Sequence, residues 1–181
     1  MKSCHHRPPK CRRGLAAPGR KAGYEVIALR RGGADASAAD TVAVAVPGPA
    51  ISAALGAVTG LAGKIAIDAT YAYPSGNEAF PSLAEKVKSF TGGPVAKNFN
   101  LNFAVRYDQI AVQRVRPSSS YATDDGVRQD TEQLITDAGC DPAPLGGLDT
   151  ARAPEDLTWL LLAAMKDSAL IVYRFAIYPE Q

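Results

Sequence analysis

The sequence predicts an α/β fold, a doubly wound parallel sheet covered by helices on both faces. The first observation is that short apolar runs alternate with segments whose apolar residues recur at helical spacing. The second is that residues 41–47, TVAVAVP, show no polar alternation, which is typical of a strand buried on both faces. Sheets of this kind bind ligands at the carboxyl ends of their strands, so we expect the functional residues there.

Bulk composition limits the classes of protein to which the chain can belong. It has 181 residues, which suits one domain or one domain with a small extension. Hydrophobic residues make up 46% and charged residues 21%, which excludes a disordered type of chain. The net charge is +2, and much of the basic excess lies in residues 1–31. The body of the chain therefore lacks the electrostatic field of a nucleic-acid-binding protein.

The sequence also bears on cellular location. No apolar run approaches the roughly 20 residues that cross a membrane, and no apolar segment follows the basic N-terminus as in a secretory signal. Cys4, Cys11 and Cys140 are odd in number, so we expect no disulfide framework and a reduced, cytoplasmic setting. Cys4, His5, His6 and Cys11 suggest zinc, but the second spaced pair of ligands that structural zinc sites usually have is missing.

The expected elements follow the apolar pattern in order. We expect strands over 24–29, 41–47, 63–70 and 94–100, and helices over 14–23, 49–58, 82–90, 126–138 and 156–165. Pro18 and Gly19 are expected to break or kink the first helix, and Gly23 to cap its C-terminus.

The helix predicted after position 125 has its own signals. Asp124 or Asp125 is expected to cap its N-terminus, because a side-chain carboxylate can accept from the free N–H groups of the first turn. Leu134 and Ile135 are expected to face the core.

Residues at the strand exits are the candidates for a site. Arg30 and Arg31 follow the first predicted strand, and either they clamp a 2′-phosphate or they are solvated loop charges. Pro47 stops a strand, and Asp68 and Thr70 in their simplest interpretation cap the next turn. The last exit carries three asparagines whose simplest role is to satisfy loop backbone: Asn98, Asn100 and Asn102.

Four stretches resemble a known family: residues 42–73, 92–103, 132–142 and 146–156. The ordered series AVP, IDAT and K-x-FN at successive strand exits is its most specific part. The chain, from about residue 14 to the C-terminus, resembles the NADPH-dependent reductases of the deazaflavin coenzyme F-420, the coenzyme-dependent NADP oxidoreductases.

The resemblance implies a Rossmann domain that binds NADP(H) and passes hydride between the nicotinamide and coenzyme F-420 or a similar acceptor. By matching positions, Arg31, with Arg30 beside it, would hold the 2′-phosphate. Val46 and Pro47 would line the adenine–ribose side of the cleft, and Thr70 would lie near the nicotinamide end. Hydride transfer needs no acid–base residue, so no catalytic residue is assigned.

The sequence departs from that family at three places on its body. Tyr71 stands where the family usually has Asn, and KDSALIVY after position 165 replaces a Gly-rich pair. Both changes affect the acceptor side of the site. Pro18 and Gly19 occupy positions where helix-compatible residues are expected.

The stretch HHRPPKCRRG, residues 5–14, is the largest departure. Positions 3–13 hold no glycine, and Pro8 and Pro9 cannot donate hydrogen bonds. This stretch can form neither a central strand nor the glycine-rich loop that cradles a diphosphate. One hypothesis is an out-of-frame translation, because suitable codons read one base later give Ile-Ile-Gly-Arg-Arg-Asn-Val-Gly-Gly. The alternative is a genuine N-terminus that stays disordered.

Either explanation gives the same domain organisation. We expect residues 1–13 to be an abnormal segment and residues 14–181 to be the NAD(P)-binding domain with a C-terminal helix. The first strand of the fold is then missing or disordered, and cofactor binding is impaired because main-chain donors to the diphosphate are lost.

Three functions are compatible with the sequence. The first is an NADPH-binding oxidoreductase domain. The second is a non-catalytic remnant or binding module that keeps the fold without a working cofactor site. The third, nucleic-acid binding through residues 2–31, is disfavoured because Tyr24 is the only aromatic residue there.

The C-terminal run that begins at Thr158 is more apolar than one exposed helix requires. It either packs into the core or forms a homodimer interface. We expect the other partners to be a small-molecule cofactor and an acceptor.

Overall fold

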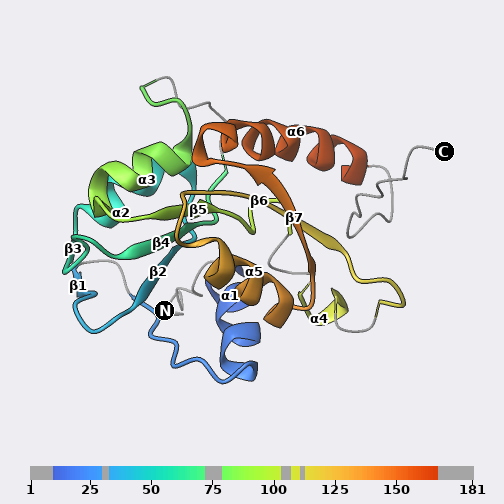
Figure 1. Cartoon of the computed structure of the whole chain (residues 1–181), viewed down its shortest axis with the longest axis horizontal. Coiled ribbons are helices and arrows are strands. Elements are labelled where there is room, and N and C mark those ends of the chain that lie inside the picture. Colours follow the sequence, from blue (N-terminus) through green and yellow to red (C-terminus); the bar gives the residue numbers. More distant parts are fainter. Residues whose placement is uncertain (1–9, 30–32, 72–78, 103–106, 111–112, 167–181) are drawn as a thin grey trace, which may run out of the picture.

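The computed structural model of the chain describes residues 10–29, 33–71, 79–102, 107–110 and 113–166 (Figure 1). Its main sheet has five strands in the order β2-β4-β5-β6-β7. They are β2 (Thr41–Val44), β4 (Ile65–Asp68), β5 (Val95–Lys97), β6 (Ser118–Thr123) and β7 (Asp141–Gly146). All neighbouring pairs are parallel except β5 with β6. The predicted α/β class is confirmed.

Helices cover both faces of this sheet (Figure 1). One side carries α2 (Ile51–Leu55), α3 (Leu83–Thr91) and α6 (Arg152–Lys166), and the other carries α1 (Lys10–Lys21), α4 (Tyr107–Ile110) and α5 (Arg128–Asp137). Two short 3₁₀ helices, η1 (Gly48–Ala50) and η3 (Leu148–Thr150), precede α2 and α6. This arrangement is the doubly wound one that the sequence predicts.

The core divides in the same way. The largest cluster packs Ile51 of α2 and Val87 of α3 against Val44 and Val95. On the opposite face, Ile67 of β4 packs with Val127 near the start of α5. Because successive side chains of a strand point to opposite faces, Ala66 belongs to the first cluster and Ile67 to the second.

The strand β2 lies at the edge of the sheet. Within the described residues, β4 is its only partner, in the register Thr41↔Ile65 to Val44↔Asp68. Val42 and Val44 are buried, whereas Thr41 and Ala43 are exposed. The prediction of a strand buried on both faces is therefore wrong for 41–44, because an edge strand here has only one face covered. Of residues 1–13, where the first strand was expected to be missing or disordered, 1–9 lie outside the described residues and 10–13 belong to the helix α1.

The segment 24–29 is not a strand, contrary to the prediction. A β-strand is stabilised by a hydrogen-bonded neighbour, and no described strand pairs with this segment. Ile27 is 63% exposed, while Leu29 packs against the largest core cluster. A second, two-stranded sheet forms instead between β1 (Ala34–Asp35) and β3 (Val58–Thr59).

The helix α1 runs through Pro18, so the break predicted there does not occur, while the alternative of a kink stays a prediction. It spans Lys10–Lys21 and packs against α4 and α5, so tertiary contacts outweigh the hydrogen bond that proline cannot make. Gly23 ends it as predicted: φ is 95°, and Tyr24 N–H donates to the Gly19 carbonyl at 3.0 Å. The boundary expected between residues 13 and 14 stays a prediction.

The helix α5 is present, but its N-terminus is not capped by an aspartate. Its N-cap is Val127, which makes no side-chain hydrogen bond. Asp124 instead accepts from the backbone N–H of Val95 at 2.9 Å and from Lys88 Nζ at 2.8 Å, so it joins α3 to the sheet. Ile135 is fully buried, and Leu134 is partly buried against the core, as predicted.

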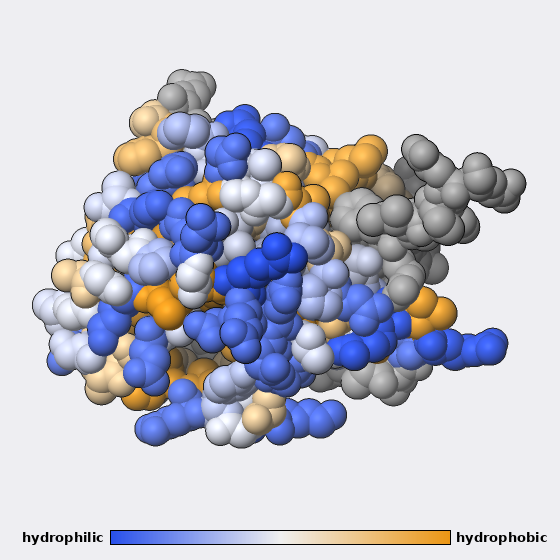
Figure 2. Space-filling view, in the orientation of Figure 1, coloured by the Kyte–Doolittle hydropathy of each residue, from blue (hydrophilic) through white to orange (hydrophobic). Residues whose placement is uncertain are grey.

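The surface in Figure 2 is mainly hydrophilic, with apolar residues gathered over α6. Leu160 of this helix is 64% exposed and Trp159 is 45% exposed. No helix among the described residues has the length and apolar character needed to span a membrane.

Candidate functional site

The carboxyl ends of β2, β4 and β5 lie side by side, because these three strands are parallel neighbours. The chain leaves β2 through Val46, Pro47 and Gly48, and it leaves β4 through Thr70 and Tyr71. This edge of the sheet is where the fold class places a ligand site.

The exits of β2 and β4 are joined by a close backbone approach at Gly48. Its N–H donates to the Tyr71 carbonyl at 3.3 Å. A Cβ atom at this position would lie 3.1 Å from the Tyr71 oxygen and 3.2 Å from Leu83 Cδ1. Glycine suits this position because a larger residue would push against the Tyr71 carbonyl and Leu83.

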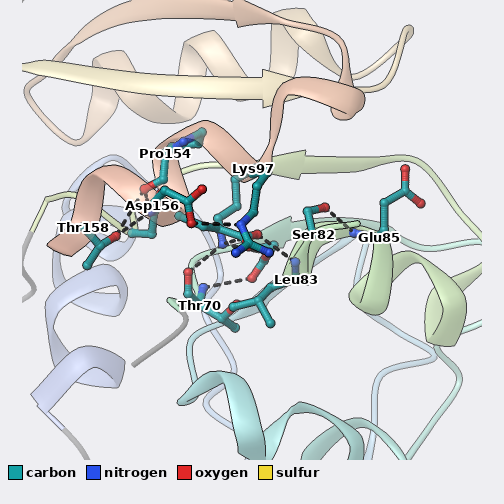
Figure 3. A network of polar contacts seen from close by, with 12 residues as sticks. Thr70, Ser82, Leu83, Glu85, Lys97, Pro154, Asp156 and Thr158 are labelled. Atoms are coloured by element: carbon teal, nitrogen blue, oxygen red, sulfur yellow. Dashed lines mark hydrogen bonds and ion pairs between the residues drawn. The ribbon is translucent and has the colours of Figure 1, made fainter. Parts of the chain in front are cut away.

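A buried network of charged groups lies beneath this edge (Figure 3). Lys97, the last residue of β5, has a fully buried ammonium that contacts Asp68 Oδ2 at 2.9 Å and Glu155 Oε1 at 3.4 Å. It also donates to the Thr70 carbonyl at 2.6 Å. Both carboxyl side chains are themselves fully buried. Buried charges are retained only when they are paired in this way.

Each carboxylate also accepts a backbone N–H. Asp68 Oδ1 accepts from Thr70 N–H at 2.8 Å, and Glu155 Oε1 accepts from Leu83 N–H at 2.7 Å. Leu83 is the first residue of α3, so Glu155 satisfies a free donor at a helix N-terminus. Burial raises the pKa of Glu155, while the nearby Lys97 ammonium lowers it and Asp68 raises it.

Two oxygens of the network have no hydrogen-bond partner within the part of the chain that the structure describes. They are Thr70 Oγ1 and Glu155 Oε2, and both belong to fully buried residues. Unpartnered buried polar atoms are uncommon, so these two are candidates to meet a ligand or water.

The three asparagines after β5 do more than satisfy loop backbone. Asn98 Nδ2 donates to the Ser120 carbonyl of β6 at 2.8 Å, and Asn100 Nδ2 donates to the Pro154 carbonyl of α6 at 2.7 Å. Asn102 Nδ2 contacts Cys140 Sγ at 3.2 Å. They therefore join the segment after β5 to α6, to β6 and to Cys140, which directly precedes β7.

The residues predicted to bind the cofactor fall into two groups. Val46, Pro47 and Thr70 come together at the shared edge of β2 and β4; Val46 is half-buried, Pro47 is exposed and Thr70 is buried. Arg30 and Arg31 lie outside the described residues. The roles assigned to all five stay predictions.

The sequence interpretation missed Lys97 and Glu155 as members of one network. A lysine at the end of the apolar run PVAK was a usable signal, because a buried lysine needs a carboxylate partner. The partner is far along the chain, on α6, and no local pattern identifies it. No group of three or more His, Cys, Asp or Glu residues that could hold a metal occurs in the described ranges.

The two residues at the β2 exit are apolar: Val46 is half-buried and Pro47 is exposed. The charged groups beneath them are buried and paired. A glycine loop leading from a first strand into a helix, which would cradle a diphosphate, is absent from the described residues.

Comparisons with known proteins agree with this architecture. The chain is similar to a candidate F420-dependent NADP reductase from Arthrobacter sp. FB24, at 26% identity over 78% of this chain and 71% of that one, with a TM-score of 0.66. It is also similar to a hypothetical protein of Sinorhizobium meliloti, at 25% identity over 62% and 59%, with a TM-score of 0.54. No family model matches the sequence, and no curated protein matches it. The similarities confirm a Rossmann-like α/β fold.

Proposed function

We propose that the chain is an NADP(H)-binding oxidoreductase domain whose cofactor affinity is weakened. The carrying observation is the shared edge of the parallel strands β2, β4 and β5, where Val46, Pro47 and Thr70 meet. The similarity to a candidate F420-dependent NADP reductase supports the choice of cofactor and of a deazaflavin-type acceptor.

Hydride transfer between two rings requires that they be held face to face, and the nicotinamide of bound NADP(H) would donate or accept the hydride. In this proposal Val46 and Pro47 line the adenine–ribose side and Thr70 lies at the nicotinamide end. The buried Thr70 hydroxyl has no hydrogen-bond partner among the described residues, which leaves it for a polar ligand group on that side. Arg30 and Arg31 hold the 2′-phosphate.

The described residues fit the diphosphate of NADP(H) less well than they fit its other parts. The described residues offer no glycine loop, and β2 keeps an edge without a partner among them. Each lost main-chain bond to a phosphate oxygen is worth roughly 1.5–3 kcal/mol. Losing two or three of them weakens binding by several orders of magnitude. The frameshift hypothesis for residues 1–13 explains this loss, and the gene sequence tests it directly.

The test is a calorimetric titration of the purified chain with NADPH and with NADH. We expect NADPH to bind with a dissociation constant well above micromolar, and more tightly than NADH. Arg31→Ala should reduce this preference, whereas Arg152→Ala, which changes an exposed arginine of α6, should not.

Each outcome of the titration has a clear meaning. Micromolar NADPH affinity would contradict the weakened site. No binding of either nucleotide at millimolar concentration would overturn the oxidoreductase function and favour the non-catalytic remnant, which is also supported by the lack of a described strand on the outer side of β2.

A homodimer through the C-terminal apolar segment is a second proposal. It is supported by the exposure of Trp159 and Leu160 on α6. Size-exclusion chromatography at two concentrations tests it, and Leu160→Glu should shift a dimer to the monomer position.

A further inference from the structure

The backbone of Thr70 is held at both of its polar groups by charged side chains. Its N–H donates to Asp68 Oδ1 at 2.8 Å, and its carbonyl accepts from Lys97 Nζ at 2.6 Å. The two side chains also hold each other, at 2.9 Å. All three residues are fully buried, so water does not compete for these bonds.

The same ammonium reaches α6. Glu155 lies in the first turn of that helix and offers one oxygen, Oε1, to Lys97 at 3.4 Å and to Leu83 N–H at 2.7 Å. A second contact fixes this turn, because Asn100 Nδ2 donates to the Pro154 carbonyl at 2.7 Å. The first turn of α6 is thus attached to the β5 exit at two points and to α3 at one (Figure 3).

We propose that Lys97 and Glu155 are positioning residues of the cofactor cleft, which fix Thr70 at its nicotinamide end and make that position depend on the docking of α6. The inference rests on the proposed function, because it takes Thr70 to lie beside the nicotinamide. Lys97 acts through the Thr70 carbonyl and through Asp68. Glu155 acts through Lys97 by supplying a second negative partner to a buried ammonium.

This arrangement gives the two buried charged residues a structural role. An aliphatic residue at position 97 would fill the space but would leave the Thr70 carbonyl without its donor. A neutral residue at position 155 would leave Asp68 as the single described carboxylate that pairs with the Lys97 ammonium. In both cases the backbone at Thr70 loses restraint while the strands β4 and β5 keep their ladder bonds.

The first experiment measures amide hydrogen exchange of Thr70 by NMR, relative to Ala66, whose N–H donates to the Pro94 carbonyl within the sheet. The variants are Glu155→Gln, Asp68→Asn and the double variant Lys97→Met with Asp68→Asn, which avoids leaving a buried carboxylate unpaired. The control is Asp156→Asn, which changes the next residue of the same turn, whose side chain is 59% exposed.

The double variant should speed exchange at Thr70 by about tenfold or more relative to Ala66, and clearly more than Asp68→Asn alone, because Asp68 Oδ1 accepts the measured N–H and only the difference between these two variants reports on Lys97. Glu155→Gln should speed exchange less, and Asp156→Asn should leave it unchanged. The same ratio of Thr70 to Ala66 in the double variant and in Asp68→Asn would overturn the positioning role of Lys97. Glu155→Gln, which keeps an oxygen for Leu83 N–H, covers the case in which the double variant does not fold.

The second experiment compares titrations with NADPH and with adenosine 2′,5′-bisphosphate, followed by chemical-shift changes at millimolar ligand. Glu155→Gln should lower the affinity for NADPH and leave that for the bisphosphate unchanged, since only NADPH carries the nicotinamide. Equal affinities in the variant and wild type would overturn the positioning role. If neither ligand binds the wild-type chain, the proposed function fails, and the exchange at Thr70 still decides whether Lys97 and Glu155 hold it.

Discussion

The two sides of the sheet's carboxyl edge differ in how deeply their residues are buried and in how many neighbouring strands they have. At β4 and β5 the residues Ala66, Val95 and Lys97 are fully buried, and every charge has a partner. At β2 the alternate residues Thr41 and Ala43 are exposed, and β4 is the one described neighbour. The comparison teaches that the β4–β5 half of this edge is closely packed and its charges are paired, whereas β2, whose exit is assigned to the adenine–ribose side, has one exposed face and a single neighbour among the described residues.

The largest loss of stability should follow from a change on the β4–β5 side of this edge. Lys97→Met leaves the Asp68 carboxylate buried without its cation, which costs about 3–5 kcal/mol of the free energy of unfolding. Urea unfolding measures this, and adding Asp68→Asn should restore much of the loss. If Lys97→Met alone were neutral, the ammonium would not be paired as the structure shows.

A matched pair of alanines compares the two sides directly. Ala66→Val in β4 overpacks a fully buried position and should cost about 1–3 kcal/mol. Ala43→Val in β2 changes an exposed position, where about 0.5 kcal/mol or less is expected. The urea unfolding midpoints of the two variants measure these costs. Equal costs would mean that β2 is covered on both faces in solution.

The pH dependence of the free energy of unfolding tests whether the pKa of Glu155 is raised in the folded state. Burial raises its pKa in the folded state above the usual 4.5, with Lys97 and Asp68 as the charged groups that face it. The folded state then binds more protons than the unfolded state, so this residue lowers the free energy of unfolding as the pH rises from 4.5 through the raised pKa.

Glu155→Gln removes that titration. The free energy of unfolding of the variant relative to wild type should therefore rise with pH between 4.5 and neutrality. Unfolding in urea at several pH values measures the difference, with Asp156→Asn as the exposed control. A difference that does not change with pH would show that the pKa of Glu155 is the same in both states.

The smallest expected effect concerns reactivity rather than stability. Burial raises the pKa of the Cys140 thiol to about 11, so little thiolate forms at neutral pH. In a Cys4→Ser, Cys11→Ser background, a disulfide reagent should label Cys140 only after denaturant is added. Rapid labelling of the folded chain would show that the β6–β7 side opens more readily than the structure implies.

Local patterns were enough to predict the three parallel strands β2, β4 and β5. The apolar runs that became these strands and the helical apolar spacing of α3 are short-range features. The strand β6 was missed because its SSSYAT sequence is polar, although all six residues are buried. Its serines are satisfied by distant partners, as Asn98 Nδ2 bonded to Ser119 Oγ at 3.2 Å shows.

The candidate site could be predicted only in part for the same reason. Strand exits can be read from the chain, so Val46, Pro47 and Thr70 were found together. The link from Lys97 to Glu155 joins β5 to α6 and depends on tertiary packing, which no spacing rule gives. Likewise, 24–29 has the composition of a strand, yet strand formation needs a neighbour that composition does not reveal.

The strand β7 prevents a further strand from pairing on its side of the sheet. Pro142 and Pro144 lie within it and lack the N–H groups that another strand would need to pair along its outer edge. The edge of β2 carries no proline over Thr41–Val44. Any additional strand, from this chain or from another molecule, should therefore join beside β2, so crowding or partial unfolding would extend this protein from one side only.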